Sequence, residues 1–144
     1  MILKQIIDSY DFDPRFLSYF ASQCAKEAMT KVKDPDPDPR SMLAIEVAER
    51  YGNGEDFDQG YLDKVRDDAA AAAARYASLY AYDAAYDAAD HASAADHAYY
   101  AAYYAALALG KDNQDYFVPL LLRLIETRLT KLEQCLILGT TNDG

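Results

Sequence analysis

The chain has 144 residues and is strongly acidic: 14 Lys and Arg stand against 24 Asp and Glu, for a formal net charge of −10. A charge of this sign opposes binding to nucleic-acid phosphates and to anionic membrane surfaces, and it favours a cationic partner. The length suffices for one compact domain, which we predict over 1–138. Chain ends are often poorly ordered, and we expect a disordered tail over 139–144.

Cysteine usage and hydropathy indicate the compartment. The two cysteines, Cys24 and Cys135, each fall inside a helical apolar pattern. No signal peptide and no apolar run of ~18 residues is found. We therefore predict a cytoplasmic protein with reduced thiols that does not contact a membrane.

Three helices are predicted before residue 53. Apolar residues recur at helical spacing over 2–10. Asp13, which is followed by proline, has the pattern of an N-cap and begins the second helix. Alternate prolines over 33–39 then favour an extended connector. Asp38 repeats the cap-plus-proline pattern and begins a third helix, which ends at Gly52.

The longest helical pattern covers 61–109. Its centre, 76–104, contains almost only Ala, Tyr, Asp and His. Ala is the best helix former, and its small side chain lets other helices approach closely. A single straight helix over this length would be about 70 Å long, too long for a small domain to cover. We therefore predict a break near Tyr82-Asp83, which gives a long Ala/Tyr-rich helical pair.

One last amphipathic helix is predicted over 116–136, after a turn that begins at Gly110. No strand pattern competes with these helices anywhere in the sequence. The predicted fold class is all-α, a single-domain bundle of about six helices with short loops.

Several segments of the chain resemble one known family. They are Phe20–Glu27 (FASQCAKE), an Asp/Pro-rich turn that closes on Pro39-Arg40, Ala44–Arg50 (AIEVAER), and the His-x5-His spacing of His91 and His97. With these segments, residues 16–109 are similar to the immunity-protein-five-like family of bacterial polymorphic toxin systems, whose Ala-rich helices are punctuated by histidines. The resemblance implies a small helical protein that neutralises a partner.

The candidate binding residues lie in the Ala/Tyr-rich segment. If that segment is one continuous helix, tyrosines and aspartates form a polar stripe along it, with a histidine on each flank. Such a stripe is either the solvated face of an Ala-rich helix or an acidic, aromatic surface for a cation-rich partner. The residues predicted to bind a partner or ligand are Tyr76, Tyr80, Asp83, Asp87, Asp90, His91, His97 and Tyr104.

The two histidines do not predict a metal site. His91 and His97 are six residues apart, about 120° around one helix, whereas a shared metal requires a spacing of three or four. We expect a histidine packed among small residues and hydrogen bonded to an Asp or Tyr of a neighbouring helix. No nucleophile with its base and no phosphate-binding loop is present, so neither an enzyme nor a cofactor is predicted.

Three functions are compatible with this pattern. The first is an immunity or anti-defence protein that neutralises a toxin or host defence effector by stoichiometric binding. The second is a sponge for a nucleotide signal, with its base stacked on tyrosines and its phosphate held by Arg66, Arg75 or Arg123. The third is an acidic mimic of nucleic acid. A homo-oligomer through the Ala-rich helices is a further option, because small residues let backbones approach closely.

Overall fold

The computed structural model describes residues 2–32, 37–76, 79–91, 94–113 and 115–139, so most of the predicted connector and tail lie outside the described residues. Within these ranges it contains eight α-helices and no strand. They are α1 (Ile2–Asp8), α2 (Pro14–Met29), α3 (Pro39–Gly52), α4 (Gln59–Arg75), α5 (Tyr80–Ala89), α6 (Ala94–Ala108), α7 (Val118–Arg128) and α8 (Lys131–Leu138). The all-α prediction is confirmed, and the predicted count of about six helices is too low.

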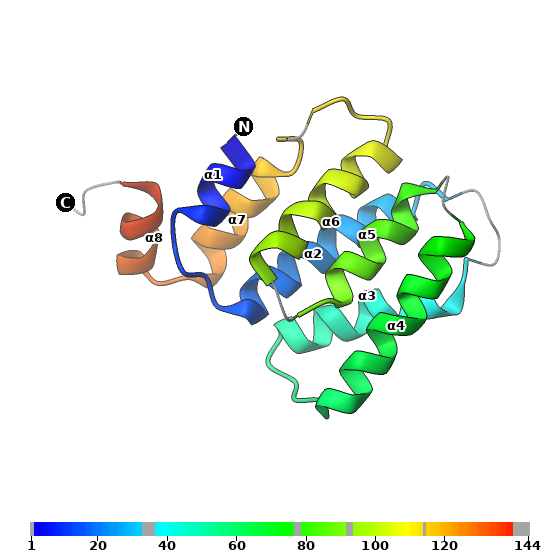
Figure 1. Cartoon of the computed structure of the whole chain (residues 1–144). Coiled ribbons are helices and arrows are strands. Elements are labelled where there is room, and N and C mark those ends of the chain that lie inside the picture. The colour runs from blue at the N-terminus through cyan, green and yellow to red at the C-terminus, as the bar shows by residue number, and fades with distance from the viewer. Residues whose placement is uncertain (1, 33–36, 77–78, 92–93, 114, 140–144) are drawn as a thin grey trace.

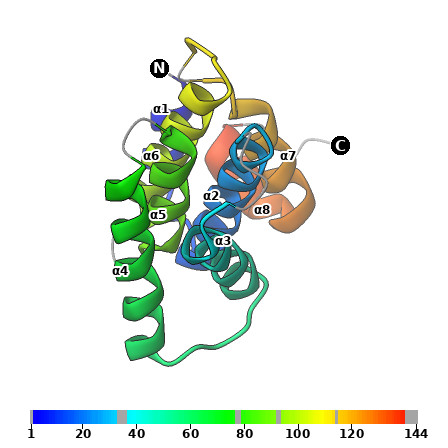
Figure 2. The same ribbon diagram turned by 90° about the vertical axis from the view of Figure 1, so that its right-hand side faces the viewer.

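The helices are arranged in layers. Figure 1 shows α4, α5 and α6 side by side in front, with α2 and α3 behind them. Helix α2 is central, because it packs against α3, α5, α6 and α7. Seen after a 90° turn, α4 to α6 lie on one side, α2 and α3 in the middle, and α7 with α8 on the other side (Figure 2). The Ala-rich half of the sequence therefore forms one side of the molecule.

The predicted starts of α2 and α3 are confirmed by their caps. The side chain of Asp13 accepts the backbone N–H of Arg15 at 2.8 Å. The side chain of Asp38 accepts the backbone N–H of Arg40 at 3.0 Å, and both helices carry proline in the first turn. These bonds join residues only two positions apart, and for that reason the sequence pattern was sufficient to locate them.

The contact between α2 and α3 requires glycine at position 52. A Cβ atom there would lie 2.6 Å from the Cβ of Tyr19 and 2.9 Å from the carbonyl oxygen of Arg15. We predict that Gly52→Ala lowers the free energy of unfolding by about 1–3 kcal/mol, because α2 must shift away. Urea denaturation measures this change. Gly60→Ala is the control, since its Cβ would meet only the side chain of Asp58, and an equal loss in both variants would contradict the close approach.

The Ala-rich segment forms three helices instead of the predicted pair. The chain leaves α4 at Tyr76 and enters α5 at Tyr80, and it leaves α5 at Asp90. The predicted break near Tyr82 is wrong, because Tyr82 lies inside α5 and is fully buried. Its ring stacks on that of Tyr76 with centroids 4.6 Å apart, and its hydroxyl accepts the backbone N–H of Asp38 at 3.2 Å. This contact with the start of α3 fixes the position of α5.

The predicted last helix is also divided. Leu129 is extended, and Thr130 caps a separate helix, α8. The Thr130 side chain accepts the backbone N–H of Glu133, and the Glu133 carboxylate accepts the backbone N–H of Thr130. This reciprocal capping box has a sequence signature, Thr-x-x-Glu, but the apolar spacing continues across it and concealed the break.

Alanines fill the space between α5, α6 and α2. The buried alanines of α5 and α6 are Ala81, Ala84, Ala85, Ala88, Ala89, Ala98, Ala101, Ala102, Ala105 and Ala106. Because α5 and α6 bury mainly methyl groups on these faces, their backbones pack closely within the chain. The small-residue seam proposed for oligomerisation is therefore inside the fold rather than on its surface.

Candidate functional site

The residues predicted to bind a partner do not share one stripe. The chain is not helical at Tyr76, Asp90 or His91, so the continuous helix on which the stripe depended does not exist. The structure separates the predicted residues into a largely buried polar cluster, which contains Asp87 and His97, and an exposed aromatic surface, which contains Tyr80. These two places have different chemistry.

His97 on α6 lies between two carboxylates at the end of α5. Its Nδ1 atom is 2.9 Å from Oδ1 of Asp87, and its Nε2 atom is 3.2 Å from Oδ2 of Asp90. The hydrogen bond to Asp87, together with the charge of Asp90, raises the pKa of His97 above its ordinary value. We call these three side chains the carboxylate bridge. It joins α5 to α6 and favours the imidazolium form, in which both ring nitrogens donate.

The carboxylate bridge removes two predicted residues from the surface. The side chains of Asp87 and Asp90 are only 7% and 12% exposed. The interpretation of Asp87 and Asp90 as part of a solvated face is therefore wrong. The nucleic-acid mimic, which requires an exposed row of carboxylates, cannot use these two side chains. Asp83, one turn earlier in α5, is partly exposed, and burial raises its pKa, with Asp87 adding to the effect.

His91, which follows α5 in the chain, occupies a different environment, against α2 and α3. Its Nδ1 atom is 2.8 Å from the Oγ atom of Ser18, and its ring packs on Tyr51 with centroids 4.4 Å apart. Burial lowers the pKa of His91 to about 4. The predicted packed histidine with a carboxylate partner is confirmed for His97, whereas His91 pairs with a serine. Ser18 is buried, so this pair is a packing contact rather than an accessible nucleophile with its base.

Five tyrosines form a continuous aromatic surface across α5 and α6, here called the tyrosine row. Its members are Tyr80, Tyr99, Tyr100, Tyr103 and Tyr104, whose neighbouring ring centroids lie 5.3 to 6.5 Å apart. Tyr80 and Tyr100 are 42% and 46% exposed. The predicted site included only Tyr80 and Tyr104 from this row. The i,i+4 spacing of the other rings in α6 was the signal for the remaining three.

Two of the three candidate phosphate-binding arginines, Arg66 and Arg75, pair with groups outside the tyrosine row. Arg66 forms ion pairs with its neighbours Asp63 and Asp67 on α4. The guanidinium of Arg75 lies over the ring of Tyr76, which itself stacks on the buried Tyr82 and is absent from the row. A hollow lined by Tyr103 of the row has a volume of about 70 Å³. Ligand pockets typically measure about 300–1,000 Å³, so this hollow does not fit a nucleotide.

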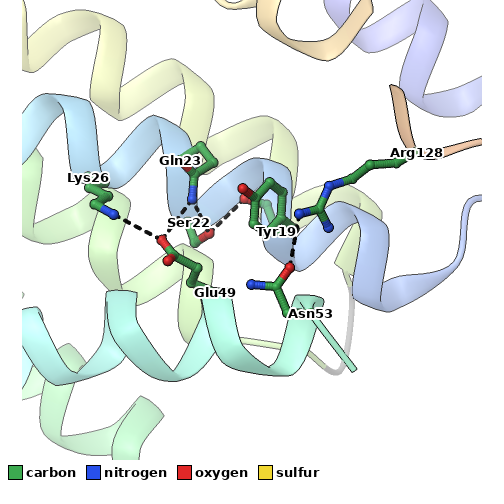
Figure 3. Close-up of polar contacts among 7 residues, drawn as sticks. All are labelled: Tyr19, Ser22, Gln23, Lys26, Glu49, Asn53 and Arg128. Atoms are coloured by element: carbon green, nitrogen blue, oxygen red, sulfur yellow. Dashed lines mark hydrogen bonds and ion pairs between the residues drawn. The ribbon is translucent and has the colours of Figure 1, made fainter. Parts of the chain in front are cut away.

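A larger hollow lies between α2 and α3, away from all predicted residues. Its volume is about 500 Å³, and its walls are mainly apolar side chains such as Met29 and Met42. The polar groups at its edge already pair with one another. Glu49 accepts hydrogen bonds from Gln23 at 2.8 Å and from Lys26 at 3.2 Å (Figure 3). A further charged residue of the lining, Glu46, lies 4.0 Å from Arg50 of the same helix.

Comparisons of the chain with known proteins found no relative. No family model, no curated protein and no solved structure matches the chain. In the part of the chain that the structure describes, no helix is long and apolar enough to cross a membrane. Over the same residues, no group of three or more His, Cys, Asp or Glu side chains is arranged to hold a metal ion.

Proposed function

We propose that this chain is a non-catalytic immunity or anti-defence protein, which inhibits a toxin or defence effector by stoichiometric binding. The observation that supports this proposal is the tyrosine row on α5 and α6, in which Tyr80 and Tyr100 are exposed and the other three rings are partly buried. The inhibitory role comes from the resemblance of residues 16–109 to immunity proteins. The free, buried thiol of Cys24 fits action in a reducing compartment such as the cytoplasm.

The tyrosine row has the properties of a protein-binding surface. Tyrosine supplies a large contact area and loses little conformational entropy on binding, which explains its frequency at binding hot spots. The row is also held rigidly, because the alanines beneath it are buried and the carboxylate bridge joins its two helices. A preorganised surface of this kind loses less entropy when it binds.

The charge of the chain indicates the chemistry of the partner. The net charge of −10 attracts a cationic surface and accelerates the encounter with it. Asp83 interacts electrostatically with Tyr104 at the edge of the row. An arginine of the partner can therefore stack on a tyrosine ring and pair with this carboxylate at once.

The double variant Tyr80→Ala/Tyr100→Ala tests this surface. Native mass spectrometry of the tagged wild type recovered from host lysate should show an added mass of several kilodaltons or more, and calorimetry with that purified partner gives the affinity. We expect the double variant to bind about 30-fold or more weakly, because both rings are exposed anchors. Tyr61→Ala on α4, 39% exposed, is the matched control and should bind like the wild type.

Two results would contradict the proposal. Equal affinity of the double variant and of the Tyr61→Ala control would show that the partner binds elsewhere. An added mass of only a few hundred daltons, with no protein partner, would instead support the nucleotide sponge. Inhibition is tested separately, by coexpression of the recovered partner with each variant and measurement of cell growth.

A further inference from the structure

The hollow between α2 and α3 has the size and the lining of a ligand site. Its volume of about 500 Å³ lies within the range of about 300–1,000 Å³ that is typical of ligand pockets. Among the described residues, its charged side chains are Lys26, Glu46 and Glu49. Its apolar wall consists of Met29, Pro37, Pro39, Met42, Leu43 and Ile45. A mainly apolar wall with a few polar groups fits a small molecule that has an apolar body and one polar group.

The apolar wall leaves large side chains in contact with water. Met42 is 41% exposed and Leu43 is 38% exposed, whereas Met29 beside them is buried. Covering the two exposed side chains removes apolar surface from water, which favours binding. Methionine side chains are flexible and adapt to irregular shapes, so two of them in one wall can fit an apolar body closely.

The backbone around the hollow is fixed before any ligand binds. At the start of α3, the backbone N–H of Asp38 donates to the hydroxyl of the buried Tyr82, and the Asp38 side chain caps the helix. The prolines on either side of Asp38 restrict the backbone further. At the other end of the pair, Gly52 of α3 lies directly against Tyr19 of α2. A hollow held at both ends loses little entropy when it binds.

The positive charge in the lining is already paired. Nζ of Lys26 is 3.2 Å from Oε2 of Glu49, and the side chain of Gln23 donates to the same oxygen at 2.8 Å (Figure 3). An anionic group that binds Lys26 must compete with this carboxylate. The Lys26–Glu49 pair therefore does not select an anionic ligand.

The remaining charge in the lining is the carboxylate of Glu46. Among the described residues its ion-pair partner is Arg50, at 4.0 Å. Arg50 donates to both carboxylate oxygens of Glu55 at 2.5 Å, so its stronger pair is with Glu55. The side chain of Glu46 is 63% exposed. The lining thus offers one accessible carboxylate beside an apolar wall, which is complementary to a cation with an apolar body.

We propose that this hollow binds a small cationic amphiphile, with its apolar body against Met42 and Leu43 and its ammonium group at Glu46. The negative charge of the whole chain also raises the local concentration of cations. The hollow lies on α2 and α3, whereas the tyrosine row lies on α5 and α6. This inference therefore does not depend on the proposed inhibitory function, and a test of one leaves the other unchanged.

NMR of the full chain with ¹³C-labelled methionine methyl groups tests the site at pH 7. Octylamine, octanoate and 1-octanol are the probes, because they share one alkyl chain and differ in charge. Octylamine should shift the signals of Met29 and Met42 with a dissociation constant of about 1 mM. 1-Octanol should bind about 3-fold more weakly and octanoate about 5-fold more weakly. Met29→Leu and Met42→Leu, which conserve volume, assign the two signals.

Glu46→Gln should weaken octylamine binding about 3-fold and leave 1-octanol binding unchanged. Glu126→Gln is the matched control, because it removes the same charge from an exposed position of α7 and should bind octylamine like the wild type. Unshifted Met29 and Met42 signals at about 10 mM octylamine would overturn the proposal. Octanoate binding as tightly as octylamine, or equal weakening by Glu46→Gln and Glu126→Gln, would overturn it as well.

Discussion

His97→Leu should lower the free energy of unfolding by about 3 kcal/mol at pH 6. The change removes the imidazole that pairs with Asp87, whose side chain is 7% exposed, and with Asp90. Removing one partner of a buried ion pair typically costs about 3–5 kcal/mol. We take the lower end because the side chain of His97 is itself partly exposed. Urea denaturation at constant pH measures the loss.

The carboxylate bridge also predicts how this loss depends on pH. Because the pKa of His97 is raised in the folded state, its stabilisation is complete below the unfolded pKa of about 6.5 and is lost as the pH rises through the folded pKa. The cost of His97→Leu should therefore be larger at pH 6 than at pH 9. Asp83→Asn is the control. Because burial disfavours the charged form of Asp83, removal of this charge should leave the free energy of unfolding unchanged or raise it slightly.

A second variant separates the carboxylate bridge from simple loss of packing. If the cost of His97→Leu comes from a stranded carboxylate, adding Asp87→Asn should recover part of the stability, because the amide is neutral. The double-mutant cycle then gives a coupling energy of about 1–3 kcal/mol. Additive effects of the two substitutions would show that the bridge does not contribute as a unit.

Acidification should destabilise the protein through His91. Burial lowers the folded pKa of this residue to about 4, below its unfolded value of about 6.5, so the unfolded chain binds the proton first. Stability should fall by about 2 kcal/mol between pH 6.5 and pH 5, and by about 3 kcal/mol down to pH 4. Protonation also charges a ring that packs against Tyr51 near the guanidinium of Arg15.

His91→Asn is the variant that isolates this effect. The Asn side chain carries an acceptor near the position of Nδ1, which Ser18 contacts, but it does not titrate. The variant should be less stable than the wild type at pH 7 and should lose less stability on acidification to pH 5. His97 is present in both proteins, so its own titration contributes equally to the two stability curves and does not mask the difference. Parallel stability curves for the two proteins would contradict the assignment to His91.

Both predictions bear on binding as well as on stability. The carboxylate bridge joins α5 to α6, and His91 holds the end of α5 against α2 and α3; α5 and α6 carry the tyrosine row. A loss at the junction should therefore lower affinity for a partner even though neither histidine belongs to the row. Measurement of binding by His97→Leu at a temperature where it stays folded checks this connection.

The sequence by itself determined the features that depend on residues close together in the chain. The all-α class follows from helix propensity and from apolar spacing. The helix starts at Asp13 and Asp38 follow from N-caps, in which each Asp side chain accepts the backbone N–H of the residue two positions later. The start of α8 at Thr130 also has a local signature, a capping box of four residues, although the apolar spacing predicted one helix across it. Such interactions join residues close together in the chain, so the sequence pattern alone is sufficient to predict them.

Tertiary structure alone decided where the Ala-rich segment breaks and which of its side chains are exposed. An Ala-rich sequence contains no residue that ends a helix locally. The position of α5 is set instead by the buried Tyr82, whose hydroxyl accepts a hydrogen bond from the backbone of Asp38, 44 positions away in the sequence. Helix α6 places His97 against the end of α5, where it pairs with Asp87 and Asp90, whose side chains are largely buried. Because the same Tyr, Asp and Ala side chains fit a solvated or a buried face equally well, only the packing of α2 against α5 and α6 could assign them.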